Sequence, residues 1–548
     1  MSASGHRTLG QYLVEALQAA GVQHVFGIPG IHNLEMYRGL EHAALRHIGA
    51  RHEQGLGFMA DGYARVSGRP GVCWTISGPG VSNIATALGQ AYADSVPLLL
   101  IASQNRRGEA GSGRGFLHEL PDQRALADAL TAASFLIDAP DALPAALSRS
   151  FELFATGRPR PVYIEIPRDV LAADAGSLPL PRFGAAAPRA PAALLAAAAR
   201  SLREARRPLV LAGGGARRAA GPLRALAERL NAPVVMTTNA RGLLPPAHEL
   251  AVAASPSLEA VRALIAAADL VLAVGTEIGP TDYDMFELRG FPPPARLLRI
   301  DIDARQLNRN ATACLGICAD AAVTLQELSQ QDLRDPGDRW PRARAAAAAA
   351  AARTGARAEL PARARRHVEL LDAIRDALPE AVLVGDSTQP VYAGNLAFAA
   401  ATPGSWFNAA TGYGTLGYAL PASVGAALAA PDRPIVCLMG DGGLQFCLGE
   451  LAVPREVDAW LAILVWNNQG YGEIRSAMLA AGIRPCGVDP QPPQLRRLAA
   501  AYGYAYRLIE SAATLRAALR RFARRRQVVL LELMAGALEA QACAAAER

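Results

Sequence analysis

The sequence of 548 residues contains no lysine, so all 55 of its basic residues are arginine. GC-rich coding explains this bias more simply than an arginine-specific function does. Together with 49 acidic residues the arginines give a formal charge of +6, and they form no long basic run. Because nucleic-acid-binding proteins gather their basic charge into a patch or stripe, the scattered charge argues against a nucleic-acid partner.

Cysteine is also scarce: seven residues, an odd number, are spread from Cys73 to Cys543. Cys314 and Cys318 lack the second Cys/His pair of a zinc site, so a reduced protein is expected. Residues 1–10 lack the apolar core of a signal peptide, and no apolar stretch has the length of a membrane span without charges or turn residues. We therefore expect a cytoplasmic protein with no membrane partner.

Three blocks of alternating strand-like and helix-like segments follow one another along the chain. Such alternation predicts parallel sheets covered by helices on both faces, and the length is too great for one core. We expect three doubly wound α/β domains, over residues 1–180, 192–335 and 362–548. A stretch rich in Pro, Ala and Gly, residues 178–191, reads as a linker, and the alanine-rich residues 345–352 predict a solvated connecting helix.

The apolar, β-rich runs within the blocks are the expected strands. They are residues 25–28, 72–76, 97–102, 161–166, 207–212, 233–237, 270–274, 296–302, 381–384, 435–439, 462–466 and 528–533.

Two short motifs in the third block point to chemistry. Gly440–Gly442 (Gly-Asp-Gly) comes near the end of a buried strand, and Asn467–Asn468 follows 24 residues later at the end of the next. Glycines let a backbone approach a diphosphate, and magnesium prefers oxygen ligands, which Asp441, Asn468 and the Gly470 carbonyl could supply. Open α/β sheets bind ligands at the carboxyl ends of their strands. A lone Gly-Asp-Gly would read as a turn, but the pair at this spacing predicts a diphosphate and metal site.

With this pair of motifs the chain resembles the thiamine-diphosphate enzymes of the pyruvate decarboxylase and acetolactate synthase superfamily. The resemblance covers nearly the whole chain. The first block carries the segments 51–54, 60–65 and 77–83, which resemble a pyrimidine-binding domain, and the third block carries 385–389 and 414–418. It implies that Glu53 activates the cofactor by a hydrogen bond to its aminopyrimidine ring. Without its neighbours, Glu53 would read as an ordinary carboxylate on a helix surface.

The resemblance also implies a set of cofactor contacts and a subunit arrangement. The contacts are Pro29, Glu53, Asn83, Thr388, Gln389, Gly414, Leu416, Gly440, Asp441, Gly442, Gly443, Asn468 and Gly470, with Asp441, Asn468 and Gly470 as magnesium ligands. In this family the cofactor lies between the pyrimidine-binding domain of one subunit and the diphosphate-binding domain of another. A homodimer at least, and commonly a homotetramer, is therefore expected.

Two features bear on the reaction. His118 falls where pyruvate decarboxylases place active-site histidines, and a histidine suits proton transfer near neutral pH. The alternative is an ordinary histidine of a surface loop beside Glu119. The segment 274–279 does not match the flavin-binding segment of the synthases, and the glycines 213–215 are a weak nucleotide signal. FAD is therefore not expected.

Glu473 bears on the substrate. It stands at a helix start that lines the substrate pocket in relatives, at a position where decarboxylases of apolar substrates carry an apolar residue. A carboxylate there is costly unless it is solvated or paired, and a guanidinium could pair with it. A salt bridge to a nearby arginine is the equal alternative.

Taken together, the motifs, including the segments 27–30, 32–35 and 385–390, resemble those of 5-guanidino-2-oxopentanoate (2-ketoarginine) decarboxylases. The expected reaction is decarboxylation of that small 2-oxo acid to 4-guanidinobutanal, in arginine catabolism. The alternatives are an acetolactate-synthase-like carboligase acting on pyruvate and a degenerate binding subunit. The second is disfavoured because Glu53, Asp441 and Asn468 are all present.

Overall fold

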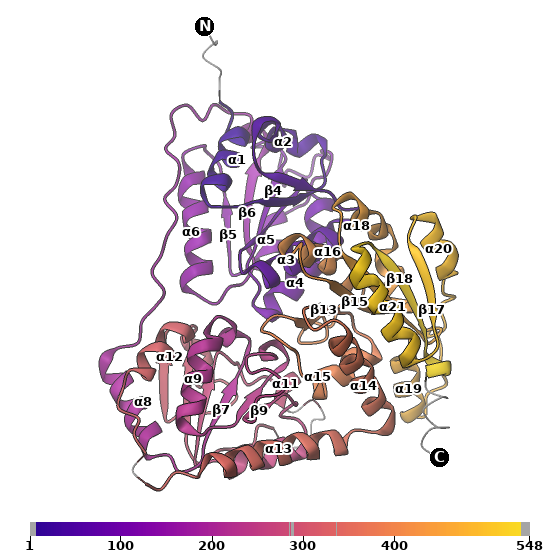
Figure 1. Cartoon of the computed structure of the whole chain (residues 1–548). Helices are drawn as coiled ribbons and strands as arrows, with labels where there is room; N and C mark the ends of the chain where they lie inside the picture. Colours follow the sequence, from indigo (N-terminus) through magenta and orange to yellow (C-terminus); the bar gives the residue numbers. More distant parts are fainter. Residues whose placement is uncertain (1–6, 284, 286–289, 336, 539–548) are drawn as a thin grey trace. The chain divides into compact units, whose positions relative to one another are not determined.

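The computed structural model describes residues 7–283, 285, 290–335 and 337–538. The chain forms two compact units. Unit 1 comprises residues 1–186, 412–435 and 443–461, and unit 2 comprises 187–411, 436–442 and 462–548. Three six-stranded sheets carry the fold (Figure 1).

Each sheet is built from parallel strands. The N-terminal sheet has the order β2 (Arg46–Ile48), β1 (His24–Gly27), β3 (Gly71–Thr75), β4 (Leu98–Gln104), β6 (Val162–Pro167), β5 (Ala133–Leu136). The central sheet has the order β12 (Leu315–Cys318), β11 (Leu297–Asp301), β10 (Leu270–Val274), β7 (Pro208–Ala212), β8 (Val234–Met236), β9 (Ala251–Val252). The third sheet has the order β14 (Trp406–Asn408), β13 (Val382–Gly385), β15 (Ile435–Gly440), β16 (Leu461–Asn467), β18 (Val529–Met534), β17 (Ala505–Ile509). The predicted doubly wound α/β class is confirmed.

In each sheet the first strand of the block lies inside the sheet, with later strands added on both sides. The chain reverses its direction of winding between β1 and β3, between β7 and β10, and between β13 and β15. Loops leave such neighbouring strands in opposite directions, so ligands bind in the crevice at the carboxyl ends of the pair. The fold thus offers three crevices, and the candidate site residues lie at the first and the third.

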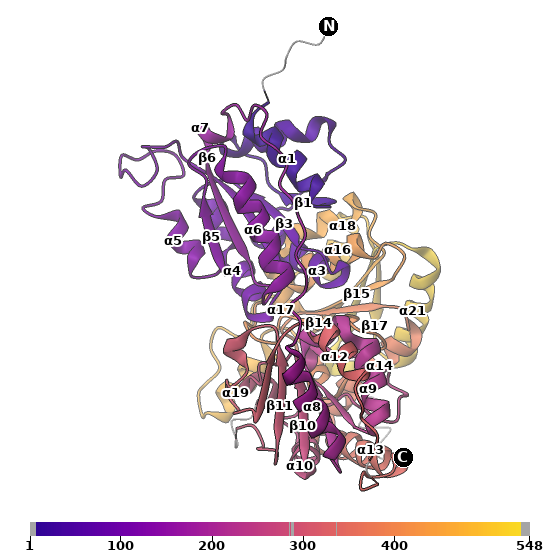
Figure 2. The same ribbon diagram turned by 90° about the vertical axis from the view of Figure 1, so that its left-hand side faces the viewer.

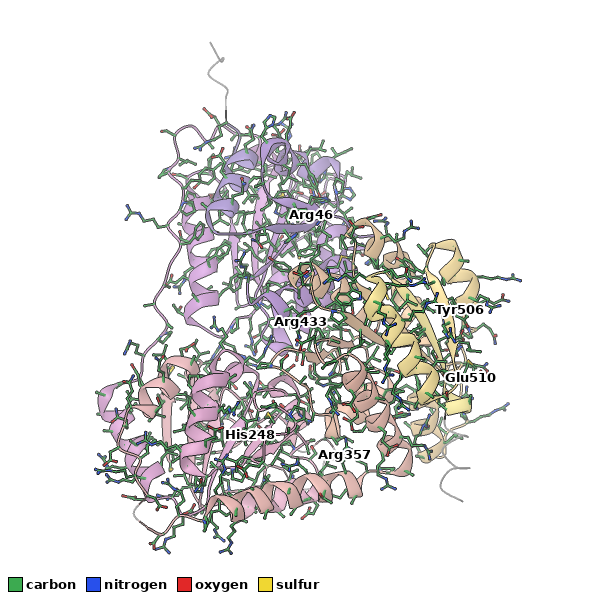
Figure 3. All side chains as sticks on the ribbon, viewed as in Figure 1. Arg46, His248, Arg357, Arg433, Tyr506 and Glu510 are labelled. Carbon is green, nitrogen blue, oxygen red and sulfur yellow. The ribbon has the colours of Figure 1, made fainter. Side chains whose placement is uncertain are left out.

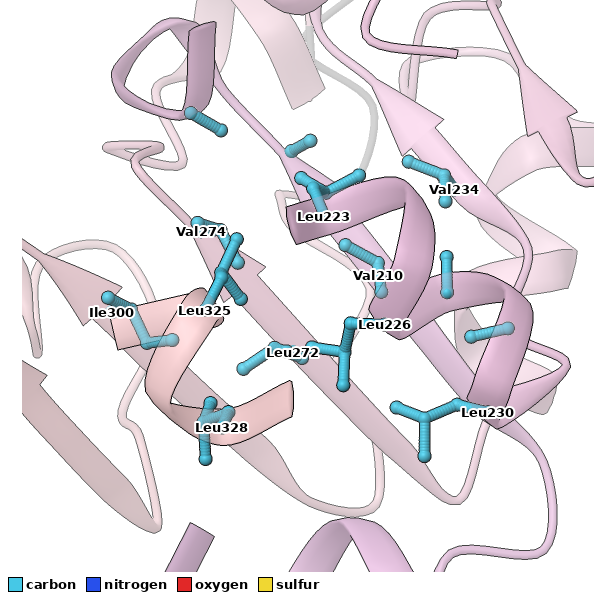
Figure 4. Close-up of a cluster of buried hydrophobic side chains, with 14 of the residues drawn as sticks. Val210, Leu223, Leu226, Leu230, Val234, Leu272, Val274, Ile300, Leu325 and Leu328 are labelled. Atoms are coloured by element: carbon cyan, nitrogen blue, oxygen red, sulfur yellow. The ribbon is translucent and has the colours of Figure 1, made fainter. Parts of the chain in front are cut away.

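Apolar strands and amphipathic helices make the cores. In the central sheet one face is covered by α8 (Ala192–Glu204), α9 (Ala220–Leu230) and α12 (Ala321–Ser329). Figure 4 shows leucines of α9 and α12 pointing onto this face, toward Val210, Leu272 and Ile300. Leu223, Leu226 and Leu230 recur every three or four residues, which places them on one side of α9.

The other face of the central sheet is covered by α10 (Glu259–Ala267) and α13 (Arg342–Glu359) (Figure 2). The alanine-rich segment lies in α13, as predicted, but the expectation of a fully solvated helix was wrong. Ala345, Ala349, Ala352 and Ala356 are buried because small side chains let this face of α13 approach its neighbours closely. Two of its arginines, Arg342 and Arg353, are partly buried and donate to the backbone carbonyls of Glu228 and Ala251.

The N-terminal sheet packs against α1 (Leu9–Ala19), α6 (Ala142–Thr156) and α7 (Arg168–Leu171) on one face. Helix α3 (Glu53–Ser67) packs closely with α4 (Pro79–Asp94) and with α16 (Ala419–Ala429), all in unit 1. In unit 2, α14 (Ala362–Ala377) packs against both α15 (Gln389–Ala397) and α21 (Ala512–Arg525) beside the third sheet. None of the helices in the described ranges is long and apolar enough to cross a membrane.

Candidate active site

Glu53 begins α3, shortly after the edge strand β2, and is 9% exposed. Asn83 of α4 donates through Nδ2 to Glu53 Oε2 at 2.9 Å. The preceding His52 accepts from the backbone N–H of Gln54 at 3.1 Å and so caps the helix, pointing away from the Glu53 carboxylate. Glu53 and Asn83, both predicted, are therefore brought together.

Glu450 was not identified from the sequence. It is 2% exposed, and its Oε1 accepts from the backbone N–H groups of Arg51 and His52, each at 3.0 Å. Burial raises the pKa of the Glu450 carboxyl to about 7, although these two backbone N–H groups act in the opposite direction. Because the two N–H groups directly precede Glu53, Glu450 fixes the start of α3 that presents the catalytic candidate.

His118 lies in a loop that follows β4 and has a strained backbone. Its φ of +62° is in the left-handed region, which non-glycine residues seldom occupy. Gly78, after β3, lies so close that a Cβ there would be 2.6 Å from the His118 carbonyl oxygen, so only glycine fits. Asn105 donates through Nδ2 to the Leu117 carbonyl at 2.9 Å. Contacts from the loops after two strands therefore hold His118 in an uncommon conformation.

Glu119 organises the same loop from within. Its carboxylate accepts from the backbone N–H groups of Gly113 at 2.7 Å, and of Gly115 and Phe116 at 3.0 Å. Desolvation would raise the pKa of Glu119, but these N–H groups outweigh it and hold the pKa below its ordinary value. Glu119 thus binds the loop backbone, which accounts for its place beside His118.

The sequence interpretation gave His32 no role of its own, and the structure places it beside His118. The rings of His32 and His118 meet edge to face, with centroids 5.0 Å apart and planes at 87°. His32 Nδ1 lies 2.5 Å from Ser77 Oγ. His32 follows β1 and Ser77 follows β3, so the pair lies at the crevice where the N-terminal sheet reverses its winding.

Pro29 lies beside this cluster, in the loop after β1. Asn33 accepts from the Gly30 N–H at 2.8 Å and donates to the Ile28 carbonyl at 3.1 Å, which ties the loop around Pro29. Asn33 is fully buried, so these bonds are shielded from water.

Gly414 and Leu416 belong to a segment with two anchors in unit 1. Thr415 Oγ1 donates to Gln90 Oε1 at 3.1 Å, and the Tyr418 hydroxyl donates to Asp61. Leu416 lies between the anchors and is half-buried. The segment is rigid without using the Leu416 side chain, which fits the predicted role of that leucine as a support for a ligand.

In unit 2 three oxygen-bearing groups converge after β15 and β16. Asp441 is buried, and its Oδ1 accepts from the Asn468 N–H at 3.3 Å. The end of the Asn468 side chain also lies 3.1 Å from Asp441 Oδ1 and 2.7 Å from the Gly470 carbonyl. Either the amide turns its NH₂ toward these acceptors, or its oxygen makes a third acceptor beside them. Burial raises the pKa of Asp441 against several backbone N–H groups.

A second layer supports this convergence. Asn467 donates through Nδ2 to Glu532 Oε1 at 2.7 Å, and its own Oδ1 accepts from the Gln469 N–H at 3.1 Å. The Tyr506 hydroxyl, labelled in Figure 3, donates to Glu532 Oε2 at 2.5 Å. Gln469 has a left-handed backbone with φ of +59°. Strands β17 and β18 thereby fix the turn that carries Asn468 and Gly470.

The predicted glycines and threonine line the same edge. Thr388 follows β13, and a Cβ on Gly440 would lie 3.3 Å from its Oγ1. A Cβ on Gly442 would lie 2.6 Å from the Tyr471 ring, so close packing requires glycine there. Gly443 follows in the short helix α17 (Asp441–Leu444).

Gln389 connects this edge to Glu473. Gln389 Oε1 accepts from Arg363 Nη2 at 2.7 Å and from Trp466 Nε1 at 3.2 Å. Its Nε2 donates to Glu473 Oε2 at 3.1 Å. Glu473 lies in the first turn of α19 (Gly472–Ala480) and is exposed. Glu473 is thus held by the Gln389 amide, and its side chain is exposed to solvent.

Family models match three segments of the chain. They are described as the N-terminal TPP binding domain, the central domain and the C-terminal TPP binding domain of thiamine pyrophosphate enzymes, over residues 7–126, 195–328 and 384–533. The first and third segments contain Glu53, His118, Asp441 and Asn468.

Curated relatives cover most of the chain. The probable 2-ketoarginine decarboxylase AruI of Pseudomonas aeruginosa is 48% identical over 506 residues, which is 91% of this chain and 89% of the relative. The large subunit of acetolactate synthase isozyme 1 of Escherichia coli is 32% identical over 84% of this chain and 82% of its own. The large subunit of acetolactate synthase IlvB1 of Mycobacterium tuberculosis is 33% identical over 85% and 76%.

Glu450 predicts a pH dependence of stability. Its pKa is raised on folding from 4.5 to about 7, so the folded protein binds the extra proton between these values and loses stability as the pH rises through them. Glu450→Gln removes the titration but keeps an oxygen for the two N–H groups. In thermal unfolding, the stability of Glu450→Gln relative to the parent should increase from pH 5 to pH 8. The exposed Glu41→Gln is the control, and parallel pH curves for parent and Glu450→Gln would contradict the assignment.

Proposed function

The chain belongs to the thiamine pyrophosphate enzymes, and we propose that it decarboxylates a guanidino 2-oxo acid, 5-guanidino-2-oxopentanoate, to 4-guanidinobutanal and carbon dioxide. The observation that carries the class is the convergence of Asp441, Asn468 and Gly470 at the edge of the third sheet. The substrate rests on the 48% identity to a protein named a 2-ketoarginine decarboxylase and on the exposed carboxylate of Glu473.

The donor set fits magnesium. One carboxylate, one side-chain amide and one main-chain carbonyl are hard oxygen ligands, and the Asn468 amide could turn its oxygen toward a cation bound among them. Bound there, magnesium would neutralise diphosphate charge, while thiamine diphosphate supplies the carbon nucleophile and the electron sink for decarboxylation. Thr388 and Gln389, at the β13 crevice, are placed to contact the diphosphate.

Glu53 is the proposed acid–base group for the cofactor ring. A single donor, Asn83 Nδ2, fixes one carboxylate oxygen, and Glu450 fixes the backbone in front of it. The other oxygen of Glu53 is the one proposed to face the ring nitrogen of the cofactor. Such a carboxylate can hold or accept a proton at a ring nitrogen.

His118 is the proposed proton donor in the final step. After carbon dioxide leaves, the substrate carbon must gain a proton if an aldehyde is to form, and a histidine works close to neutral pH. The strained, multiply anchored backbone of His118 supports this role because such strain persists where function requires a fixed geometry.

Glu473 is the proposed partner of the guanidinium group. Its carboxylate is oriented by Gln389, whose amide oxygen is engaged by Arg363 and Trp466. A guanidinium offers a planar pair of donors to a carboxylate. A neutral or apolar side chain would leave the carboxylate with solvent alone.

An acetolactate-synthase-like carboligase remains the second candidate, because relatives of that name match most of the chain. The central crevice gives it little support. Gly213 N–H donates to the Val274 carbonyl at 2.9 Å, and Gly215 N–H donates to the Gly275 carbonyl at 3.0 Å. These glycines are explained by the close packing of two loops and need no nucleotide, and an absorbance scan for flavin in the purified protein tests the point.

We also propose a cytoplasmic homodimer, or a tetramer of dimers. Cys73, Cys314, Cys318 and Cys486 are free thiols, as in reducing compartments. Ile31, Leu34, Leu117 and Phe446 in unit 1 are each more than half exposed, and two of them flank His32 and His118 in sequence. Exposed apolar side chains around a site favour a subunit partner that covers them.

Replacing Glu53 by Gln should lower kcat by about 100-fold or more, as expected for loss of an acid–base group. The circular dichroism spectrum and the calorimetric affinity for thiamine diphosphate with magnesium should stay close to those of the parent. Glu41→Gln, at an exposed position of the same unit, is the control. A Glu53→Gln enzyme with parental kcat would remove Glu53 from the mechanism.

Replacing Glu473 by Gln should selectively reduce activity on the charged substrate. The comparison uses 5-guanidino-2-oxopentanoate and the uncharged 5-ureido-2-oxopentanoate. A charge-assisted hydrogen bond contributes about 1.5–3 kcal/mol, so the ratio of the two kcat/KM values should fall by about 10- to 100-fold. Glu510→Gln, exposed on the same unit, is the control. An equal loss of kcat/KM on both substrates would show that Glu473 does not distinguish the charged substrate from the uncharged one.

A shared site predicts complementation between two inactive variants. Glu53→Gln and Asp441→Ala should each be inactive, and Asp441→Ala should also bind cofactor and magnesium weakly. After the two proteins are mixed and exchange subunits, one site of each heterodimer has both residues intact, so about a quarter of parental activity should return. If Glu53 and Asp441 of one chain formed the site, no mixture would recover activity.

A further inference from the structure

We propose that His32 is a positioning residue for His118: it fixes the His118 imidazole in the orientation that delivers a proton to the product carbon. This inference rests on the proposed decarboxylase function and deepens it. His32 is distant from His118 in the sequence, and no motif links the two.

The contact between the rings is specific. His32 is 4% exposed, and its ring meets that of His118 at 87° with centroids 5.0 Å apart. Edge-to-face aromatic pairs of this geometry are favourable and orientation-dependent. The backbone of His118 is already fixed by Gly78 and Asn105, so the remaining freedom lies in rotation of its side chain. The His32 ring limits that rotation.

His32 is itself held from the opposite side. Its Nδ1 lies 2.5 Å from Ser77 Oγ, and Ser77 is fully buried. The hydrogen bond at one ring nitrogen sets the plane and the tautomer of a histidine. The buried Ser77 therefore holds His32, and His32 in turn holds His118. All three residues lie where β1 and β3 end.

The charges around His32 favour a neutral ring. Burial lowers the pKa of His32 most, and the positive charges of Arg168 and His118 lower it further, while Glu109 acts in the opposite direction. Arg168 Nη2 lies 3.3 Å from Glu109 Oε2, so the opposite effects of these two charges on the pKa of His32 partly cancel. A neutral His32 can support His118 through the whole proton transfer without repelling its charged form.

The test compares His32→Ala, His32→Phe and His118→Ala as holoenzymes, with His24→Ala as the matched control. His24 lies at the opposite end of β1 and also packs edge to face on an aromatic ring, that of Tyr63. Each enzyme is given the guanidino acid with and without acetaldehyde as a carbonyl acceptor. The readouts are kcat, KM, thermal midpoint, cofactor affinity, and the ratio of free aldehyde to the carboligated product.

His32→Ala should lower kcat about 10-fold or more and shift products toward carboligation, as His118→Ala does, with KM and cofactor affinity unchanged. His32→Phe keeps the ring but loses the Ser77 bond and should fall in between. The double variant His32→Ala/His118→Ala should have the same kcat and product ratio as His118→Ala alone, because both residues act through the His118 imidazole.

Three results would overturn the proposal. One is an unchanged product ratio in His32→Ala, and another is a double variant whose losses multiply. The third is a loss of cofactor affinity in both His32 variants that equals the loss of activity. If His118→Ala itself keeps parental kcat and product ratio, the proposed role of His118 fails as well, which separates that failure from one confined to His32.

Discussion

The third sheet depends on one constraint: the side chains of Asp441 and Asn468 and the Gly470 carbonyl lie within hydrogen-bonding distance of one another. With the Asn468 amide turned so that its NH₂ faces Asp441 Oδ1 and the Gly470 carbonyl, the side chain donates to both, at 3.1 and 2.7 Å. The turn that carries two of these three groups includes a left-handed Gln469 and is held by Asn467, Glu532 and Tyr506. Strands β17 and β18 thus hold the turn that presents the oxygen atoms of Asp441, Asn468 and Gly470 close together, as a site built for a ligand requires.

In the N-terminal sheet, too, hydrogen bonds from neighbouring residues hold the candidate site residues in place. Glu53 and His118 each have little intrinsic reason to stay where they are, since one starts a helix and the other has an unfavourable backbone conformation. Buried polar groups, namely Glu450 for Glu53 and Asn105 for His118, compensate. Because buried hydrogen bonds are strong, these two supporting residues can hold the backbone of the proposed catalytic residues in place.

The interior of each sheet was predictable from the sequence, and its edges were not. The twelve expected strands correspond to β1, β3, β4, β6, β7, β8, β10, β11, β13, β15, β16 and β18. The six missed strands, β2, β5, β9, β12, β14 and β17, are the two edges of each sheet. Interior strands of parallel sheets are buried on both faces and read as continuous apolar runs. Edge strands here are short, as β9 and β14 are, or half-exposed, as β2 and β17 are, and such patterns resemble loops.

Site residues were predictable where a motif carried them. Gly-Asp-Gly with Asn-Asn located Asp441 and Asn468, and the structure brings them together. Glu450 had no such signal, because an isolated glutamate in a helical segment is common. His32 lies in a segment that carries the resemblance, but nothing in the sequence linked it to His118. Their proposed roles follow only from the fold, which places His32 at the β1/β3 crevice and Glu450 at the start of α3.

The most direct test of the central claim is carbon dioxide release with thiamine diphosphate and magnesium on three substrates: 5-guanidino-2-oxopentanoate, pyruvate and benzoylformate. The structure predicts a kcat/KM for the guanidino acid at least about 100-fold above the others, equivalent to about 3 kcal/mol in transition-state binding. If pyruvate is preferred and acetolactate accumulates, the cofactor site stands, but the chain is a carboligase and the roles given to Glu473 and His118 are wrong.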